Sequence, residues 1–243
     1  MKINDSVVLI TGAATRVGRY VARHLAERGA GIAFSYYLED EPWEEAKAEF
    51  EAYGRSSFAR QVEIRDREQV VNLIHGTVQA LGRLDVLINS ASVWLKSPMM
   101  EISEADWDLA MEVNVKGPFM CSQAAAKVMQ EQGAGVIINI TDISAFQVWE
   151  GYAHHAASKA ALVSLTKYMA MELAPTIRVN AIAPGTVMLP EGASDAKRAW
   201  AVSKSVLGRI GSPEDVARMA EFLIENDFIT GSVHFVDGGR ALT

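Results

Sequence analysis

The chain alternates short runs of apolar and β-branched residues with longer stretches in which apolar residues recur at helical spacing. Several short runs are apolar at successive positions, which is typical of parallel strands buried on both faces of a sheet. Strands are predicted at residues 6–11, 31–36, 57–64, 85–90, 135–141, 176–183 and 232–237. Strands and helices repeated in this order predict right-handed crossovers and a doubly wound α/β sheet with helices on both faces.

A single domain is expected over residues 1–243. The chain is 49% hydrophobic, contains no internal repeat or low-complexity segment, and shows no linker that would divide it. One α/β domain commonly reaches about 250 residues. Residues 156–173 are apolar on more than one face, so a helix there is expected to pack on the sheet and on a second surface.

Composition and charge argue against several classes of protein. The formal charge is −7 and no cluster of lysine and arginine occurs, so a nucleic-acid partner is not expected. No apolar stretch is long enough to span a bilayer and the first residues do not resemble a signal peptide, so a cytoplasmic protein is expected. Cys121 is the only cysteine, which rules out an internal disulfide. The histidines show no metal-ligand spacing, so no metal site is predicted, and His154 is expected to face solvent or a subunit interface.

The first predicted strand leads into the glycine-containing turn TGAATRVGR. Such a turn before a helix directs free backbone N–H groups and the positive end of the helix dipole towards an anion, as in dinucleotide-binding proteins. Gly12 and Gly18 take this role, whereas Arg16 occupies the place of a middle glycine. A glycine turn alone is a weak signal, and the alternative is an ordinary turn with a solvated Arg16. A guanidinium beside the turn favours phosphate binding.

Several segments together resemble the short-chain dehydrogenase/reductase family over nearly the entire chain. TGAATRVG is similar to the family's TGxxxGxG, and INSAS at residues 88–92 to its NNAG. EVNVKGPF at 112–119 resembles its asparagine-bearing helix, and NAIAPG at 180–185 its PG segment, while SKAAL and VDGG complete the set. The resemblance implies a single-domain Rossmann-type fold with a seven-stranded parallel sheet, a nicotinamide cofactor, and a homotetramer or homodimer.

Within that family, the chain most resembles the pteridine reductase-like subgroup. This rests on the pattern TGAAxRxG, on an Asn-Ser turn in place of NNAG, and on Asp142, an aspartate thirteen residues before the active-site position. The subgroup implies reduction of a pteridine-like compound.

The resemblance also implies a set of catalytic residues. The family's tetrad is Asn, Ser, Tyr and Lys, with the last two spaced YxxxK. Asn114 and Lys159 match the asparagine and the lysine, and Asp142 stands at the serine position as in pteridine reductases. His155 stands where the family has its proton-transferring tyrosine. Tyr152 is three residues too early in the helix to replace it.

Two interpretations of this substitution remain open. In the first, Asp142 and His155 form a pair that replaces the tyrosine as acid, and the rate falls with rising pH as histidine loses its proton. In the second, His155 only fills the space of the tyrosine, and Asp142 donates the proton directly or through water.

The end of the second predicted strand favours NADP(H) over NAD(H). An NAD enzyme normally has an acid there, whereas Ser35 and Tyr36 are neutral donors, and Arg16 is expected to meet a 2′-phosphate. Glu39 and Asp40 would oppose this preference if they faced the cofactor. By resemblance, the further cofactor-binding residues are Val17, Glu63, Ile64, Asn89, Ser90, Ala91, Lys159, Pro184, Gly185 and Val187.

The substrate site is less visible in the sequence. Residues 186–205 correspond to the family's variable lid, and four aromatic residues are expected near the walls of the pocket: Trp94, Phe146, Trp149 and Trp200. Stacking of a flat heteroaromatic substrate is one interpretation, and a role in the core or at a subunit interface is the other.

Two functions from different classes are compatible with these residues. One is an NADP-dependent reductase of a pteridine-like or other C=N or C=O compound. The other is a cofactor-binding sensor, regulator or partner subunit that has lost catalysis. Retention of Asn114, Asp142 and Lys159 favours the enzyme.

Overall fold

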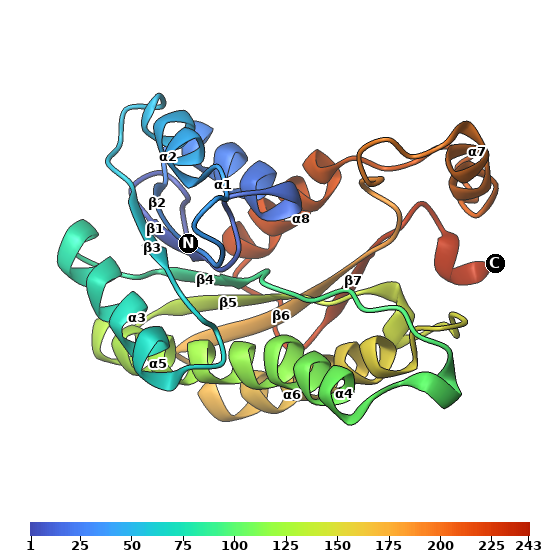
Figure 1. Cartoon of the computed structure of the whole chain (residues 1–243). Coiled ribbons are helices and arrows are strands. Elements are labelled where there is room, and N and C mark those ends of the chain that lie inside the picture. Colours follow the sequence, from blue (N-terminus) through green and yellow to red (C-terminus); the bar gives the residue numbers. More distant parts are fainter.

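In a computed structural model that describes residues 1–243, seven parallel strands form one sheet in the order β3-β2-β1-β4-β5-β6-β7 (Figure 1). The strands are β1 Val7–Ile10, β2 Gly31–Tyr36, β3 Phe58–Gln61, β4 Val86–Asn89, β5 Gly135–Ile140, β6 Ile177–Pro184 and β7 Val233–Val236. All seven predicted strands and the doubly wound α/β class are confirmed. The largest difference is β3, which ends at Gln61 rather than at residue 64.

Helices cover both faces of the sheet, with α1, α2 and α8 on one side and α3, α4, α5 and α6 on the other (Figure 1). They are α1 Arg16–Glu27, α2 Trp43–Glu51, α3 Arg67–Leu81, α4 Glu104–Met111, α5 Gly117–Gln132, α6 Ala153–Leu173, α7 Asp195–Ser203 and α8 Pro213–Glu225. Each face has its own apolar core, because the central strands present apolar side chains in both directions. No helix is both long and apolar enough to cross a membrane.

The chain reverses its direction across the sheet at β1, which pairs with β2 on one side and with β4 on the other. Thr11 lies just after β1, and its Oγ1 accepts hydrogen bonds from the N–H groups of Ser90 (3.0 Å) and Ala91 (3.1 Å) after β4. These bonds hold the two strand ends together. A ligand site is expected at such a switch point, beyond the carboxyl ends of the strands.

A single π-helical turn, Glu112–Lys116, joins α4 to α5 and contains Asn114. Single π-turns often occur at functional sites. Behind it the core is tight, and Cys121 is fully buried, which raises the pKa of its thiol to about 12 and leaves it unreactive.

The expectation that His154 faces solvent or a subunit interface is wrong. Its ring is completely buried within the chain, where α6 packs against the short helix Ile143–Ala145, and neither ring nitrogen has a hydrogen-bond partner. The side chain therefore belongs to the interior of the first turn of α6.

Candidate active site

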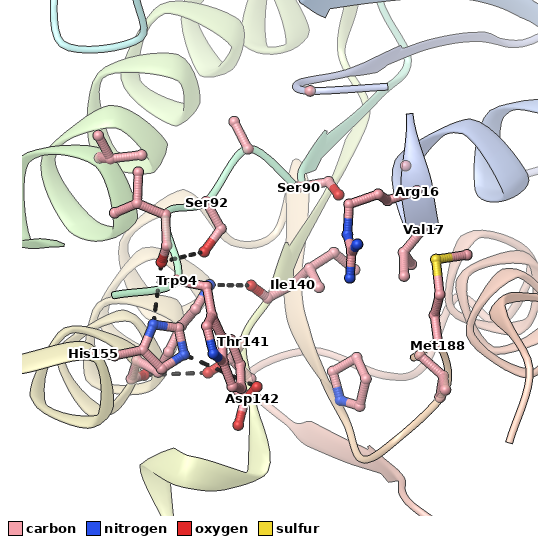
Figure 2. Close-up of a pocket in the computed structure, with 18 of the residues that line it drawn as sticks. Arg16, Val17, Ser90, Ser92, Trp94, Ile140, Thr141, Asp142, His155 and Met188 are labelled. Atoms are coloured by element: carbon pink, nitrogen blue, oxygen red, sulfur yellow. Dashed lines mark hydrogen bonds and ion pairs between the residues drawn. The ribbon is translucent and has the colours of Figure 1, made fainter. Parts of the chain in front are cut away.

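A cleft of about 1750 Å³ lies beyond the carboxyl ends of the strands (Figure 2). Its strand half is lined by the turn of residues 11–18 and the ends of β2, β3 and β4. Its aromatic half is lined by Trp94, Trp149, Tyr152 and Trp200. The predicted site residues that line the cleft are Gly12, Arg16, Val17, Gly18, Ser35, Tyr36, Glu63, Ile64, Ser90, Ala91, Asp142, His155, Lys159, Pro184, Gly185 and Val187. Asn89 and Asn114 are buried behind its wall.

The turn after β1 fits a bound phosphate chain. A Cβ at Gly12, whose φ is +66°, would lie 3.0 Å from the Cα of Ala91, so only glycine leaves the strand ends this close. Thr15 begins α1 without capping it by its side chain, so the first N–H groups of the helix stay free. Arg16 adopts a φ of +52°, a strained conformation that a middle glycine would adopt freely. Figure 2 shows its side chain directed into the cleft.

At the end of β2, the predicted neutral residues are in place. The hydroxyl of Ser35 accepts a hydrogen bond from the N–H of Gly12 at 3.2 Å. The ring of Tyr36 stacks on Trp43, with centroids 5.1 Å apart, and burial raises the pKa of its phenol. These contacts fix the wall on which an adenosine ribose would lie.

An acid that the sequence reasoning missed, Glu41, lines this part of the cleft, whereas Glu39 and Asp40 do not. Its Oε1 accepts hydrogen bonds from the N–H groups of Tyr37 (2.9 Å) and Leu38 (2.8 Å). Glu41 lies beyond the end of β2, in the turn directly before Pro42, so no periodic pattern singled it out.

Glu63, predicted beside adenine, is held by its neighbour Arg65. Its carboxylate accepts from Nη2 of Arg65 at 2.7 Å and from the backbone N–H of Arg65 at 3.0 Å. The hydrogen bonds with Arg65 hold the pKa of Glu63 below its usual range, so the carboxylate stays ionised at neutral pH.

Asn114 has a full set of hydrogen bonds. Its Nδ2 donates to the carbonyl of Val93 (3.2 Å) and to Oγ of Ser158 (3.0 Å). Its Oδ1 accepts from Oγ of Ser92 and the N–H of Val93, both at 2.9 Å. Asn114 thus ties the segment after β4 to helix α6.

The carbonyl of Val93 also meets His155, at 3.2 Å from Nδ1. Because a carbonyl only accepts, this contact places a proton on Nδ1. The other nitrogen, Nε2, is buried without a hydrogen-bond partner and lies 4.0 Å from Oδ2 of Asp142. The Trp94 ring packs 4.5 Å from the imidazole, on the same side of the cleft as Asp142 (Figure 2).

Lys159 lies one helical turn beyond His155 and is also buried. Its Nζ donates to the carbonyl of Ile140 at 3.2 Å. Burial lowers the pKa of Lys159 to about 8, and the negative charge of Asp142 partly opposes this effect. At neutral pH the cleft therefore contains a lysine that is mostly charged but has little water around it.

Of the aromatic residues predicted near the pocket, Trp94, Trp149 and Trp200 line the cleft. Phe146 does not, because it turns away and packs on Phe235 with ring centroids 4.8 Å apart. Tyr152 begins α6 and adds its ring to the cluster around Trp94. The predicted lid, residues 186–205, contains α7 and contributes Trp200.

Arg240, which the sequence reasoning did not single out, also lines the aromatic half. Its guanidinium carbon lies 4.6 Å from the ring centre of Trp149 and 5.1 Å from that of Trp200. Burial lowers the pKa of Arg240, and the charges of Asp142 and Asp237 oppose the shift. The signal that could have found it is its place directly after VDGG, beyond the end of β7.

Comparisons with known proteins agree with this geometry. A family model described as enoyl-(acyl carrier protein) reductase matches residues 12–241. A subunit of a hydroxy(phenyl)methylsuccinyl-CoA dehydrogenase from Thauera aromatica is 34% identical, with 100% of this chain and 99% of that protein covered. A 3-oxoacyl-(acyl-carrier-protein) reductase from Staphylococcus aureus is 36% identical, over 98% of this chain and 99% of the relative.

Solved structures show the same fold. A short-chain dehydrogenase/reductase from Serratia marcescens superposes with a TM-score of 0.93 at 30% identity, covering 99% of this chain and 100% of that chain. A dehydrogenase/reductase from Sinorhizobium meliloti gives 0.91 at 33% identity, covering 98% and 97%. Family match, relatives and cleft lead to one conclusion: the chain belongs to the short-chain dehydrogenase/reductase family of oxidoreductases.

Proposed function

We propose that the protein is an NADP(H)-dependent reductase of a small C=O or C=N compound, in which His155 replaces the tyrosine as proton donor. The observation that carries the proposal is Nε2 of His155, a buried nitrogen without a hydrogen-bond partner in a residue that lines the cleft. A buried polar atom without a partner is costly unless a ligand completes it.

The tautomer supports this role. With one proton held on Nδ1 by the Val93 carbonyl, a second proton on Nε2 is the one available for transfer. The Asp142 carboxylate, 4.0 Å away, stabilises that charged form and orients the ring. A substrate oxygen or nitrogen within about 3 Å of Nε2 takes the proton and leaves a neutral imidazole.

The residues of the strand half fit a dinucleotide, and a nicotinamide bound there supplies the hydride. The free N–H groups at the start of α1 hold the pyrophosphate, and Glu63 binds at the adenine. Lys159 places a positive charge beneath the nicotinamide ribose, and Pro184, Gly185 and Val187 line the wall at its ring.

NADP(H) preference is supported by the neutral side chains at the end of β2 and by the positive charge of Arg16 in the cleft. Glu39 and Asp40 are exposed and outside the cleft, so they do not oppose a 2′-phosphate at close range. Glu41 does line the cleft, but its charge is already engaged by two backbone N–H groups.

A pteridine-like substrate remains a prediction from the resemblance, and flat rings suit the aromatic half. The relatives named above are described by acyl-carrier-protein and coenzyme A substrates. Oxidation of NADPH should therefore be followed with dihydropterins, dihydrofolate, quinones, diketones and 3-oxoacyl thioesters.

With a substrate in hand, pH–rate profiles of the wild type, His155→Phe and His155→Tyr test the proton donor. We expect the wild-type rate to fall as rising pH removes the proton of the donor. In His155→Tyr this fall moves to higher pH, while any effect of Lys159 is common to both proteins. Full activity of His155→Phe over the whole range would exclude a proton-transfer role and leave Asp142 as the donor.

A second candidate function is a cofactor-binding partner subunit without catalysis of its own. It is favoured by the missing tyrosine and by the description of one relative as a subunit of a dehydrogenase. If the wild type turns over nothing and His155→Tyr is active, this second function replaces the first.

We further propose a homodimer or homotetramer. Helix α6 packs on the sheet, yet Tyr168 and Met171 on its outer side are 65% and 82% exposed. Apolar exposure on a helix that is buried on its other face suits a subunit contact. A monomeric mass by light scattering at micromolar concentration would contradict this proposal.

A further inference from the structure

Arg240 is a buried cation that has no ion pair. The residue is only 9% exposed, and although the charges of Asp142 and Asp237 act on it at longer range, neither forms an ion pair with its guanidinium. Buried charges are normally paired or fully hydrogen-bonded, because the loss of hydration is costly. The side chain of Arg240 therefore occupies a position that a partner with negative charge would stabilise.

The partly buried guanidinium of Arg178 shows what a structural arginine looks like in this chain. Its nitrogens donate to three backbone carbonyls at the end of α8 and beyond, those of Leu223, Ile224 and Ile229, at 2.8–3.0 Å. Arg240 has one side-chain partner, Oγ1 of Thr186. Most of its donor groups remain without a partner in the protein.

Arg240 lines the cleft and has donor groups that the protein leaves without a partner. Contacts with Trp149 and Trp200 engage the π-faces of these rings, whereas the N–H groups lie in the plane of the guanidinium. Arg240 lines the cleft, and only its Nη1 has a hydrogen-bond partner in the protein, so its other N–H groups remain for a ligand. Two parallel N–H groups in one plane match the two oxygens of a carboxylate.

The backbone around Arg240 has hydrogen bonds of its own, which do not involve the guanidinium. The backbone carbonyl of Arg240 accepts from Nε2 of Gln147 at 2.8 Å. Asp237 accepts from the N–H groups of Gly239 (2.9 Å) and Ala241 (2.7 Å), which fixes the turn on both sides of Arg240. The segment is thus held by its backbone, and the guanidinium is available for another role.

Charge in the aromatic half also favours an anion. Although the chain carries a net charge of −7, the cleft of which this half is a part is lined by seven lysines and arginines and by four acids: Arg16, Arg65, Lys96, Lys159, Lys197, Lys204 and Arg240 against Glu41, Glu63, Asp142 and Glu150. A cleft lined by an excess of one charge concentrates ligands of the opposite charge.

We propose that Arg240 binds a carboxylate of the substrate, and that Trp149 and Trp200 contact a flat apolar group attached to it. The substrate class is then a carbonyl or imine compound that carries both a planar ring and a carboxylate. This inference rests on the proposed function for the reaction, but the binding itself does not require turnover.

The test compares 2-naphthoate with its neutral isostere 2-naphthamide, by calorimetry on the full chain with and without NADP⁺. The wild type is expected to bind the carboxylate about tenfold to a hundredfold more tightly than the amide. Arg240→Gln removes this difference and leaves amide binding unchanged, Arg240→Lys retains part of it, and the exposed control Arg60→Gln retains all of it.

Three results would overturn the proposal. One is equal or absent binding of the two probes by the wild type. Another is an equal loss of affinity for both probes in Arg240→Gln, which would show that Arg240 only maintains the structure of the aromatic half. The third is competition by inorganic phosphate with no binding of the carboxylate. Unchanged melting temperatures of the Arg240 variants confirm that they fold.

The outcome is separable from that of the proposed function. His155→Phe should bind 2-naphthoate like the wild type, so a protein without any turnover can still support the role of Arg240. Once a carboxylate substrate is known, Arg240→Gln should raise KM about tenfold or more while changing kcat little. A fall in kcat at constant KM would contradict a binding role.

Discussion

The strand half and the aromatic half of the cleft satisfy their polar groups in different ways. In the strand half, the side chains of Thr11 and Asn114 form hydrogen bonds with backbone and side-chain groups on neighbouring elements. The carboxylate of Glu63 accepts a hydrogen bond from Arg65. In the aromatic half, His155 Nε2 lacks a partner, and Arg240 has only Thr186. The first half is therefore preorganised by the protein, whereas the second is completed by what binds in it.

Asn114 lies where the two halves meet. Its side chain bonds both the backbone N–H and the backbone carbonyl of Val93. The Val93 carbonyl also contacts Nδ1 of His155. By holding the Val93 carbonyl, Asn114 fixes Nδ1 of His155 as the nitrogen that is hydrogen-bonded. Nε2 of His155 is then the nitrogen without a partner. Asn114 and His155 are thus linked through one backbone carbonyl, and in the proposed mechanism the asparagine supports the proton donor in this way.

The largest effect on turnover is expected from a substitution of Lys159. Lys159→Met keeps the length of the side chain but removes the charge that we propose to support the nicotinamide ribose. We expect turnover to fall about 100-fold or more, with weaker cofactor binding. Turnover and NADPH titration measure the two effects. His155→Phe is the matched comparison, because it should lose turnover and keep cofactor affinity; unchanged affinity in Lys159→Met would place its charge outside the cofactor site.

The next effect concerns Asn114. Asn114→Ala removes four hydrogen bonds and leaves the N–H of Val93 without a partner, although the Val93 carbonyl keeps its contact with His155, so unfolding free energy should fall by about 2–4 kcal/mol. Urea denaturation measures the loss. Ser92→Ala, which removes only one of the four hydrogen bonds, is the control and should cost about 1 kcal/mol or less. Equal losses in both variants would show that the bonds to Val93 and Ser158 contribute little.

Much of the strand half could be predicted because its signals are local. Strands buried on both faces give unbroken apolar runs, and a glycine is required where Gly12 meets Ala91. Asn114 and Lys159 were found by resemblance, and the structure places them as neighbours of His155. Asn89 was predicted at the cofactor, and its side-chain Nδ2 donates to Ser122 and Asn139 inside the core.

The aromatic half was predicted less well, because its contacts join distant segments. Arg240 contacts Trp149, in the loop before α6, and Trp200, in α7. A periodic pattern in the sequence cannot predict contacts between such distant segments. The burial of His154 was not predicted for the same reason. Helix α6, which begins one residue before His154, packs against the short helix Ile143–Ala145 in the loop after β5. Loop residues of this kind become visible only in three dimensions.

A smaller effect links Lys159 to the pH dependence of stability. Burial lowers the pKa of Lys159 from 10.5 to about 8, so between these values the unfolded chain binds more protons than the folded one. Stability due to this residue therefore rises with pH from about 8 to 10.5, and the cost of burying the charge is fully present below pH 8.

Lys159→Met removes that pH dependence. The variant should be more stable than the wild type at pH 7, by at most about 3 kcal/mol, and the difference should shrink as pH rises to 10.5. Denaturation of both proteins at several pH values gives the difference. A variant that is less stable at pH 7 would show that the bond to the Ile140 carbonyl outweighs the cost of burial. Gain of stability with loss of function is typical of a site residue.

The smallest effect is expected at Arg16, the one charged residue of the turn in the strand half that reaches the cleft in a strained conformation. If its guanidinium meets the 2′-phosphate, Arg16→Ala should weaken NADPH about tenfold and NADH much less. Arg16→Gly separates charge from strain, since glycine adopts the positive φ freely, and it should lose the same preference while raising stability by about 1 kcal/mol. Titration of both cofactors against the three proteins decides between two sites of action. An equal loss of NADH and NADPH would move Arg16 from the 2′-phosphate to the pyrophosphate, which both cofactors share, and would leave the choice of cofactor to Ser35, Tyr36 and Glu41.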